Sequence, residues 1–268
     1  MAKGYDFARK AAIKLGELGA LGVSTQDAFI VHKFGKNPDV DDVEEVIQIS
    51  GGTLGGDSFP ENPISLEVLS SSGNDTELGS GATHITIRGF DANNAAVNTE
   101  VALDGITPVA IPGTWLRVPR TRMKAGGYYA RNAGTLTVRV AGGGNNVLQV
   151  AAGRGSSQEG WWHVEAGWTC FLYGAFMTID TGKTATIYLN SFKTDSDNMS
   201  VTELEWDGIT APIDFNPTIP YKFEEKTDIV WTAISGVNAN AVITVDFVML
   251  MIKNEVLENL DPTHFYGN

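Results

Sequence analysis

The sequence predicts an all-β protein of two sandwich-like modules, jelly-roll or immunoglobulin-like in type, preceded by an N-terminal helical arm. Three observations support this prediction. After Ile47, apolar residues recur with a period of two over most of the chain. Many of the 30 glycines stand in turn-like segments such as 142–144, where a left-handed backbone carries no steric cost. One nine-residue phrase also occurs twice, which is typical of a duplicated module.

The first element is a helix predicted within residues 1–24. Asp6 can cap it, and apolar residues at helical spacing form one stripe: Phe7, Ala11, Leu15 and Leu18. Three cations lie off the stripe: Arg9, Lys10 and Lys14. Residues 1–22 hold four cations and two anions, although the whole chain is acidic. These residues are therefore candidates for docking on a neighbouring chain, and packing on the same chain is the alternative.

Strands follow the helix. A short strand is expected at 28–34, and an acidic run then contains Asp39, Asp41, Asp42, Glu44 and Glu45. The run lacks the pattern of a calcium-binding EF-hand loop and favours a solvated turn. Further period-two runs predict strands at 65–71, 83–90, 98–103, 115–124, 135–141, 147–151, 160–165, 169–179, 185–192, 228–233 and 241–253.

The repeated phrase organises these strands into domains. Residues 99–107 read TEVALDGIT and residues 202–210 read TELEWDGIT, with six of nine positions identical. Each copy follows a strand-like run and precedes a proline-punctuated segment, so Asp104-Gly105 and Asp207-Gly208 are expected in matching turns. The predicted organisation is an arm at 1–50, modules at 51–143 and 144–253, and a tail at 254–268.

Composition excludes several classes of function. A net charge of −13 leaves no large basic face for nucleic acid. The single cysteine, Cys170, forms no internal disulfide and suits synthesis in a reducing cytoplasm. No apolar run is long enough to predict a membrane span, and residues 8–21 are too charged for a signal peptide.

The sequence offers no recognisable catalytic or metal-binding motif. The histidines His32, His84, His163 and His264 have no metal-ligand spacing, and no serine lies in a nucleophile motif. Glu100 and Glu203 occupy equivalent places in the two phrases, which duplication explains better than a glycosidase pair does. We therefore expect no enzyme activity, no metal and no cofactor.

Aromatic residues are the remaining candidates for binding. Trp161 and Trp162 are adjacent in a predicted strand, so one is expected in the core and the other exposed. An exposed tryptophan suits a protein interface or, together with Tyr129, a carbohydrate platform. The C-terminal tail ends with Phe265 and Tyr266, which serve either as a second docking element or as a frayed end.

Several characteristic phrases lie between residues 60 and 192. They are SSSGNDTELGSGA at 70–82, ITIRGFDAN at 85–93, the phrase at 99–107, GTLTVRVAGGG at 134–144, AAGRGSSQEG at 151–160 and VEAGWTCFL at 164–172. With these phrases, the segment resembles a family of virion structural proteins of tailed bacteriophages. The family tends to show PAGKT where this chain has EAGWT at 165–169, a departure at two positions. The resemblance implies a β-rich particle component and transfers no catalytic residue.

These observations lead to an expected function. The chain is predicted to be a capsid decoration, or cement, protein that bridges subunits of a phage head and is located in the virion. Its expected partners are the major capsid protein or another virion protein, and further copies of itself, with a trimer favoured. A tail, neck or fibre-attachment component and a carbohydrate-binding module are the alternatives.

Overall fold

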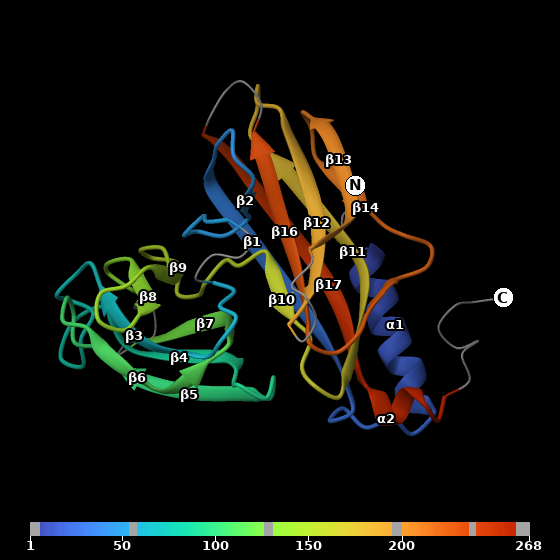
Figure 1. Cartoon of the computed structure of the whole chain (residues 1–268), viewed down its shortest axis with the longest axis horizontal. Helices are drawn as coiled ribbons and strands as arrows, with labels where there is room; N and C mark the ends of the chain where they lie inside the picture. Colours follow the sequence, from blue (N-terminus) through green and yellow to red (C-terminus); the bar gives the residue numbers. More distant parts are fainter. Residues whose placement is uncertain (1–5, 54–57, 126–130, 195–199, 236–239, 261–268) are drawn as a thin grey trace.

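The strands form four small sheets that face each other in two pairs (Figure 1). The structure is a computed structural model and describes residues 6–53, 58–125, 131–194, 200–235 and 240–260. The larger pair consists of strands from both ends of the sequence, and the smaller pair consists of β3 to β9. Each pair encloses its own apolar core.

The larger pair combines two five-stranded sheets. One sheet has the order β1-β17-β11-β14, with β15 also on β11, and the other has the order β10-β16-β12-β13, with β2 also on β16. The bounds are β1 Ala28–Val40, β2 Glu45–Val46, β10 Trp161–His163, β11 Trp168–Ile179, β12 Ala185–Lys193, β13 Val201–Ile209, β14 Ile213–Phe215, β15 Tyr221–Phe223, β16 Thr227–Ser235 and β17 Ala241–Lys253. Facing side chains such as Trp231 and Phe247 fill the core between these sheets.

The smaller pair is built from a continuous stretch of chain. Its sheets have the orders β6-β3-β8-β9 and β5-β4-β7, and the core between them includes Leu66, Ile85 and Leu136. The bounds are β3 Ile64–Ser70, β4 Ala82–Phe90, β5 Ala96–Ala102, β6 Val109–Trp115, β7 Arg117–Ala125, β8 Leu136–Val140 and β9 Asn146–Val150.

The predicted architecture of two successive jelly-roll or immunoglobulin-like modules behind an arm is wrong, because the strands form four small sheets with a different connectivity. The first strand pairs with the last, so that Ile30 lies opposite Leu250 in an antiparallel register. The strand expected within the arm therefore belongs to the larger pair. Gly143 and Gly144, at the expected module boundary, lie between β8 and β9, which pair with each other.

The helix α1, Asp6–Ala20, packs on this same chain. Its apolar stripe lies against the outer faces of β11 and β17, where Phe171, Val248 and Leu250 are buried. This cover explains the burial pattern of β17, which alternates in its first half and is continuously buried in its second half. The short helix α2, Asn254–Leu257, contributes Val256 and Leu257 to the same apolar cluster.

The two copies of the repeated phrase occupy the same place in their sheets. The first copy contains the end of β5 and the second lies largely in β13, and each of these is an edge strand paired with the strand that precedes it. Both glycines of the phrase adopt a left-handed conformation, with φ of +58° at Gly105 and +61° at Gly208. The prediction of matching turns is nevertheless wrong for the second copy, because Gly105 lies in a turn after β5 whereas Asp207 and Gly208 lie within β13.

Candidate functional site

The segment 70–82, which carries part of the family resemblance, folds around one buried carboxylate. The side chain of Asp75 accepts hydrogen bonds from the backbone N–H groups of Ala82 and Ala133 at 2.7 Å and of Gly134 at 2.8 Å. It also accepts one from the hydroxyl of Ser70 at 2.6 Å. Bonds to an ionised acceptor are about twice as strong as neutral ones. Asp75 therefore fixes both ends of this loop and the chain that leads into β8.

The repeated phrase joins this loop. Gly105 donates its N–H to the Asp75 carbonyl at 2.8 Å, and its own carbonyl accepts the N–H of Ser70 at 2.8 Å. Thr76 and Asp104 also form an antiparallel bridge. A Cβ at Gly105 would lie 3.0 Å from a backbone carbon, at a φ that side chains rarely adopt. Two sequence motifs that are distant in the chain thus form one rigid structure.

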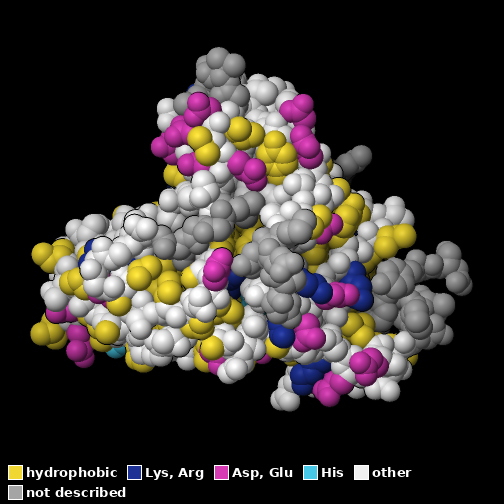
Figure 2. Space-filling view, in the orientation of Figure 1, with side chains coloured by type: hydrophobic (Ala, Val, Ile, Leu, Met, Phe, Trp, Pro, Cys, Tyr) yellow, Lys and Arg dark blue, Asp and Glu magenta, His cyan; other side chains and the backbone are white. Residues whose placement is uncertain are grey.

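This structure presents two exposed apolar side chains. Leu78 is 98% exposed and Ile106 is 67% exposed, and we call this pair the apolar tip. The tip and the larger pair lie at opposite ends of β4. This strand begins beside the tip and ends at Phe90, whose ring lies 6.0 Å from that of Trp162 in the larger pair. Figure 2 shows hydrophobic side chains at the left extremity of the smaller pair.

The second copy of the phrase shows that this exposure is particular to the first. Ile209 holds the place of Ile106 in the second copy, and it is 7% exposed and packs in the core of the larger pair. The same residue type in the same phrase is therefore buried in strand β13 in one copy and presented to solvent in a turn in the other. Packing in the core accounts for the apolar side chain of Ile209. Ile106 lies in no apolar core in the described part of the chain.

A buried ionic cluster joins the two pairs of sheets. Arg117, from β7, donates to the Asp228 carboxylate of β16 at 2.8 Å, and His163 Nδ1 lies 2.9 Å from the other carboxylate oxygen. Burial acts to raise the pKa of Asp228, but Arg117 and His163 outweigh it and hold that pKa below its usual value. Arg117 also donates to the carbonyl of Pro60. The cluster fixes the smaller pair against the larger one.

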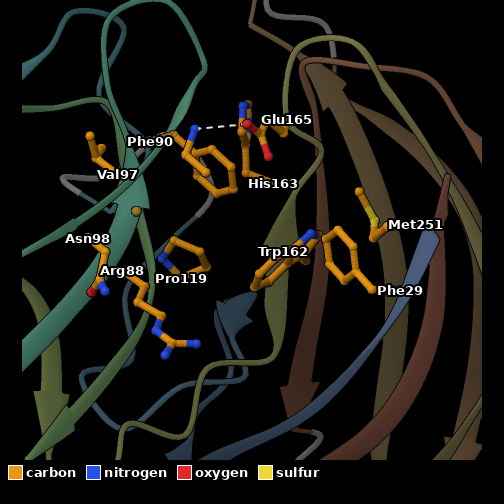
Figure 3. Close-up of a pocket in the computed structure, with 12 residues that line it drawn as sticks. Phe29, Arg88, Phe90, Val97, Asn98, Pro119, Trp162, His163, Glu165 and Met251 are labelled. Carbon is orange, nitrogen blue, oxygen red and sulfur yellow. Dashed lines mark hydrogen bonds between the residues drawn. The ribbon is translucent and has the colours of Figure 1, made fainter. Parts of the chain in front are cut away.

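An apolar cleft of about 290 Å³ opens beside this cluster. Figure 3 shows Val97 and Arg88 of the smaller pair on one side, and Phe29 and Met251 of the larger pair on the other. The Trp162 ring lies between them, and its buried indole N–H has no hydrogen-bond partner among the described residues. Lys33 and Arg120 lie 5.9 and 5.8 Å from that ring, so it is enclosed and does not form an open platform.

The structure separates the predicted site residues into three groups. Phe7, Ala11 and Leu18 are fully buried and Leu15 is half-buried, all against β11 and β17 of the same chain, so this stripe does not face a neighbour. Of the helix cations, Arg9 is exposed, Lys10 donates to Asn216 at 2.8 Å and Lys14 pairs with Glu17 at 2.6 Å. Tyr129, Phe265 and Tyr266 lie outside the described residues.

The tryptophan prediction is confirmed for the buried member of the pair but not for the exposed one. Trp161 is buried against Phe59 at a ring distance of 4.9 Å and donates to Gln48, whereas Trp162 is half-buried at the cleft. Sequence reasoning missed the apolar tip. Its signal was an apolar residue, Leu78, placed inside an otherwise polar, glycine-rich turn.

The equivalent glutamates of the two phrases lie in different pairs of sheets. Glu100 forms an ion pair with Lys124 at 3.1 Å in the smaller pair, and Glu203 accepts a hydrogen bond from Ser191 at 2.6 Å in the larger pair. Within the described ranges, no group of three potential metal ligands of the His, Cys, Asp or Glu type occurs. In the same ranges, no helix is long and apolar enough to span a membrane.

Comparisons with known proteins add weak neighbours. No family model and no curated protein matches the chain. The VP2 subviral particle of infectious bursal disease virus is similar at 12% identity over 85% of this chain and 73% of that chain, with a TM-score of 0.22. The PBSX exported protein XepA is similar at 13% identity over 84% and 88%, with a TM-score of 0.17.

A human protein has a comparable score. The CUB1-EGF-CUB2 domains of MASP-1/3 are similar at 9% identity over 84% of this chain and 98% of that chain, with a TM-score of 0.17. A viral capsid protein and an exported phage protein are thus among the weak structural neighbours. Likeness at these scores carries no argument about fold or function.

Proposed function

We propose that this chain is a structural protein of a tailed-phage virion, and specifically a capsid decoration protein without enzymatic activity. The sequence resemblance over residues 60–192 supports the virion role. The apolar tip carries the more specific proposal, because the resembling segment 70–82 and the repeated phrase jointly build it. Its expected partner is the major capsid protein.

The proposed mechanism is burial of the apolar tip at a joint between capsid subunits. Full burial of a leucine or isoleucine side chain contributes about 1.5–3 kcal/mol, so one tip alone binds weakly. An oligomer that engages several subunits at once converts such weak contacts into stable attachment. A trimer suits a threefold position of the shell. The hydrogen bonds around Asp75 keep the tip preorganised, which reduces the entropy lost on binding.

The test is incorporation into particles that lack the protein. The variant Leu78→Asp/Ile106→Asp places charge on the apolar tip, and we expect it to fold normally but to lose incorporation. The control is Ile219→Asp, which changes an isoleucine of the larger pair that is 53% exposed. We expect the control to incorporate as the wild type does. Equal incorporation of both variants would refute attachment through the tip.

The copy number in purified particles tests the location. A decoration protein is expected at a copy number comparable with that of the major capsid protein, as measured by quantitative mass spectrometry. A copy number equal to that of neck or tail components would replace the decoration role with attachment at that site.

A further inference from the structure

Although the chain is acidic, several of its cations line one cleft, which is separate from the apolar tip. This basic cleft has a volume of about 210 Å³ and lies where β1 meets β7 and the segment before β10. Charged and hydroxyl-bearing side chains line it, namely His32, Lys33, Arg120, Arg122, Ser156 and Ser157. Such donors suit the oxygen atoms of an anion.

The cations of this region are not balanced by neighbouring acids. Arg88 of β4 lies directly opposite Arg120 of β7, and Arg122 is two residues further along β7. Within the described ranges, these three arginines have no carboxylate partner. Burial, followed by repulsion from Arg122 and Arg88, lowers the pKa of Arg120. Like charges held opposite each other in a sheet are destabilising, so this arrangement needs a reason beyond folding.

Two acids lie near the basic cleft, and neither is an exposed partner for its arginines. Asp246 pairs with His32, and Glu159 is buried in the interior opposite Lys33. The guanidinium of Arg120 donates to the carbonyl oxygen of His32 at 2.6 Å, which holds it at the mouth of the cleft. The exposed guanidinium of Arg122 remains directed to solvent. The cleft therefore keeps a positive field in a molecule whose net charge is −13.

The densest run of acids in the chain extends from the end of β1 to the start of β2. We call residues 39–45 the acidic loop, in which Asp39, Asp42 and Glu44 are exposed and Val43 is 56% exposed. This loop cannot reach the basic cleft of its own molecule. Phe34, which lines the cleft, and Asp39 are five residues apart along β1, and this length of strand spans about 17 Å. Only a second molecule can bring the two surfaces together.

We propose that the basic cleft binds the acidic loop of a second copy of this chain. The carboxylates of Asp39 and Asp42 meet the guanidinium groups of Arg120 and Arg122, and Val43 lies at the mouth of the cleft. The two surfaces differ, so the contact is head-to-tail and either closes into a ring or extends into a row on a surface. This contact is separate from the apolar tip, so its failure and that of the decoration role are distinguishable.

Complementation between two defective variants tests the proposal. Arg122→Glu disables the cleft and leaves the loop intact, whereas Asp39→Lys/Asp42→Lys disables the loop and leaves the cleft intact. We expect each variant alone to have a self-association constant weakened at least about tenfold in sedimentation velocity at low salt, because like charges then face each other. An equimolar mixture should regain association, because the intact loop of one variant meets the intact cleft of the other and the two charge-reversed surfaces also attract each other.

The control and the contrary outcomes are specific. Lys222→Glu reverses a charge on β15 of the larger pair and should associate as the wild type does. The proposal is overturned if the wild type stays monomeric at all concentrations, or if the mixture of variants shows no more association than either variant alone. Stabilisation of a monomer by inorganic phosphate through Arg122 would show an anion site without a second copy, and would likewise overturn it.

Discussion

Replacing Asp75 by asparagine should destabilise the loop that carries the apolar tip. The carboxylate accepts three backbone N–H groups and one hydroxyl, and an amide can keep only one of its two oxygen positions. With its oxygen toward Ala82 and Ala133, the asparagine directs an NH₂ group against the N–H of Gly134. The bond from Gly134 is then lost, the Ser70 hydroxyl must change from donor to acceptor, and the two bonds from Ala82 and Ala133 are weakened, so we expect a loss of about 2–4 kcal/mol in the free energy of unfolding.

Urea unfolding followed by circular dichroism measures this loss, and hydrogen exchange of residues 70–82 shows whether the loop opens first. Asp91→Asn is the matched control. Asp91 accepts the N–H groups of Asn93 at 2.8 Å and Ala95 at 3.1 Å in an exposed turn. We expect it to cost less than about 1 kcal/mol because both bonds go to one carboxylate oxygen, which the amide keeps. If Asp75→Asn costs no more than this control, the loop is not organised by the buried carboxylate.

Three further predictions concern stability. Ile209→Ala should lower the free energy of unfolding by about 2–4 kcal/mol, whereas Ile106→Ala should leave it almost unchanged. Urea unfolding measures both values, and equal losses would contradict the different burial of the two residues. Gly35→Ala should prevent stable folding, because the added Cβ would lie 2.3 Å from a backbone carbon. Thermal melting measures this loss of stability. Burial raises the pKa of Glu159 to about 8 and lowers that of Lys33 to about 7. Stability should therefore fall as pH rises from about 4.5 toward 7 and recover above 8, and Lys33→Met/Glu159→Gln should flatten this profile.

The strands were predictable where burial is periodic. The run predicted at 241–253 matches β17, and the run predicted at 169–179 differs from β11 by one residue. Strand β6 was missed because Pro112 interrupts its pattern, and proline is tolerated there because β6 is an edge strand. Period-two patterns identify faces but not partners, so the pairing of β1 with β17 could not be read from them.

The candidate site was predictable only in part. The turn at residues 72–75 was visible from its serine, glycine and asparagine content, but the burial of Asp75 was not. That burial depends on backbone N–H groups from Ala133 and Gly134, which the chain supplies much later. The helix stripe shows the opposite case, because an amphipathic pattern does not say whether its apolar face meets the same chain or another one.

The pairing of the first strand with the last has a consequence for synthesis on the ribosome. All the strands of the smaller pair emerge before β17 exists, so this part can fold while β1 still lacks its partner. Until β17 has been synthesised, β1 exposes an unpaired edge, and the stripe of α1 has no β17 to cover. Late closure of this kind is slow, because contacts between distant parts of the chain must form last. Truncation before β17 should therefore yield an aggregating chain, even though most of its residues would be present.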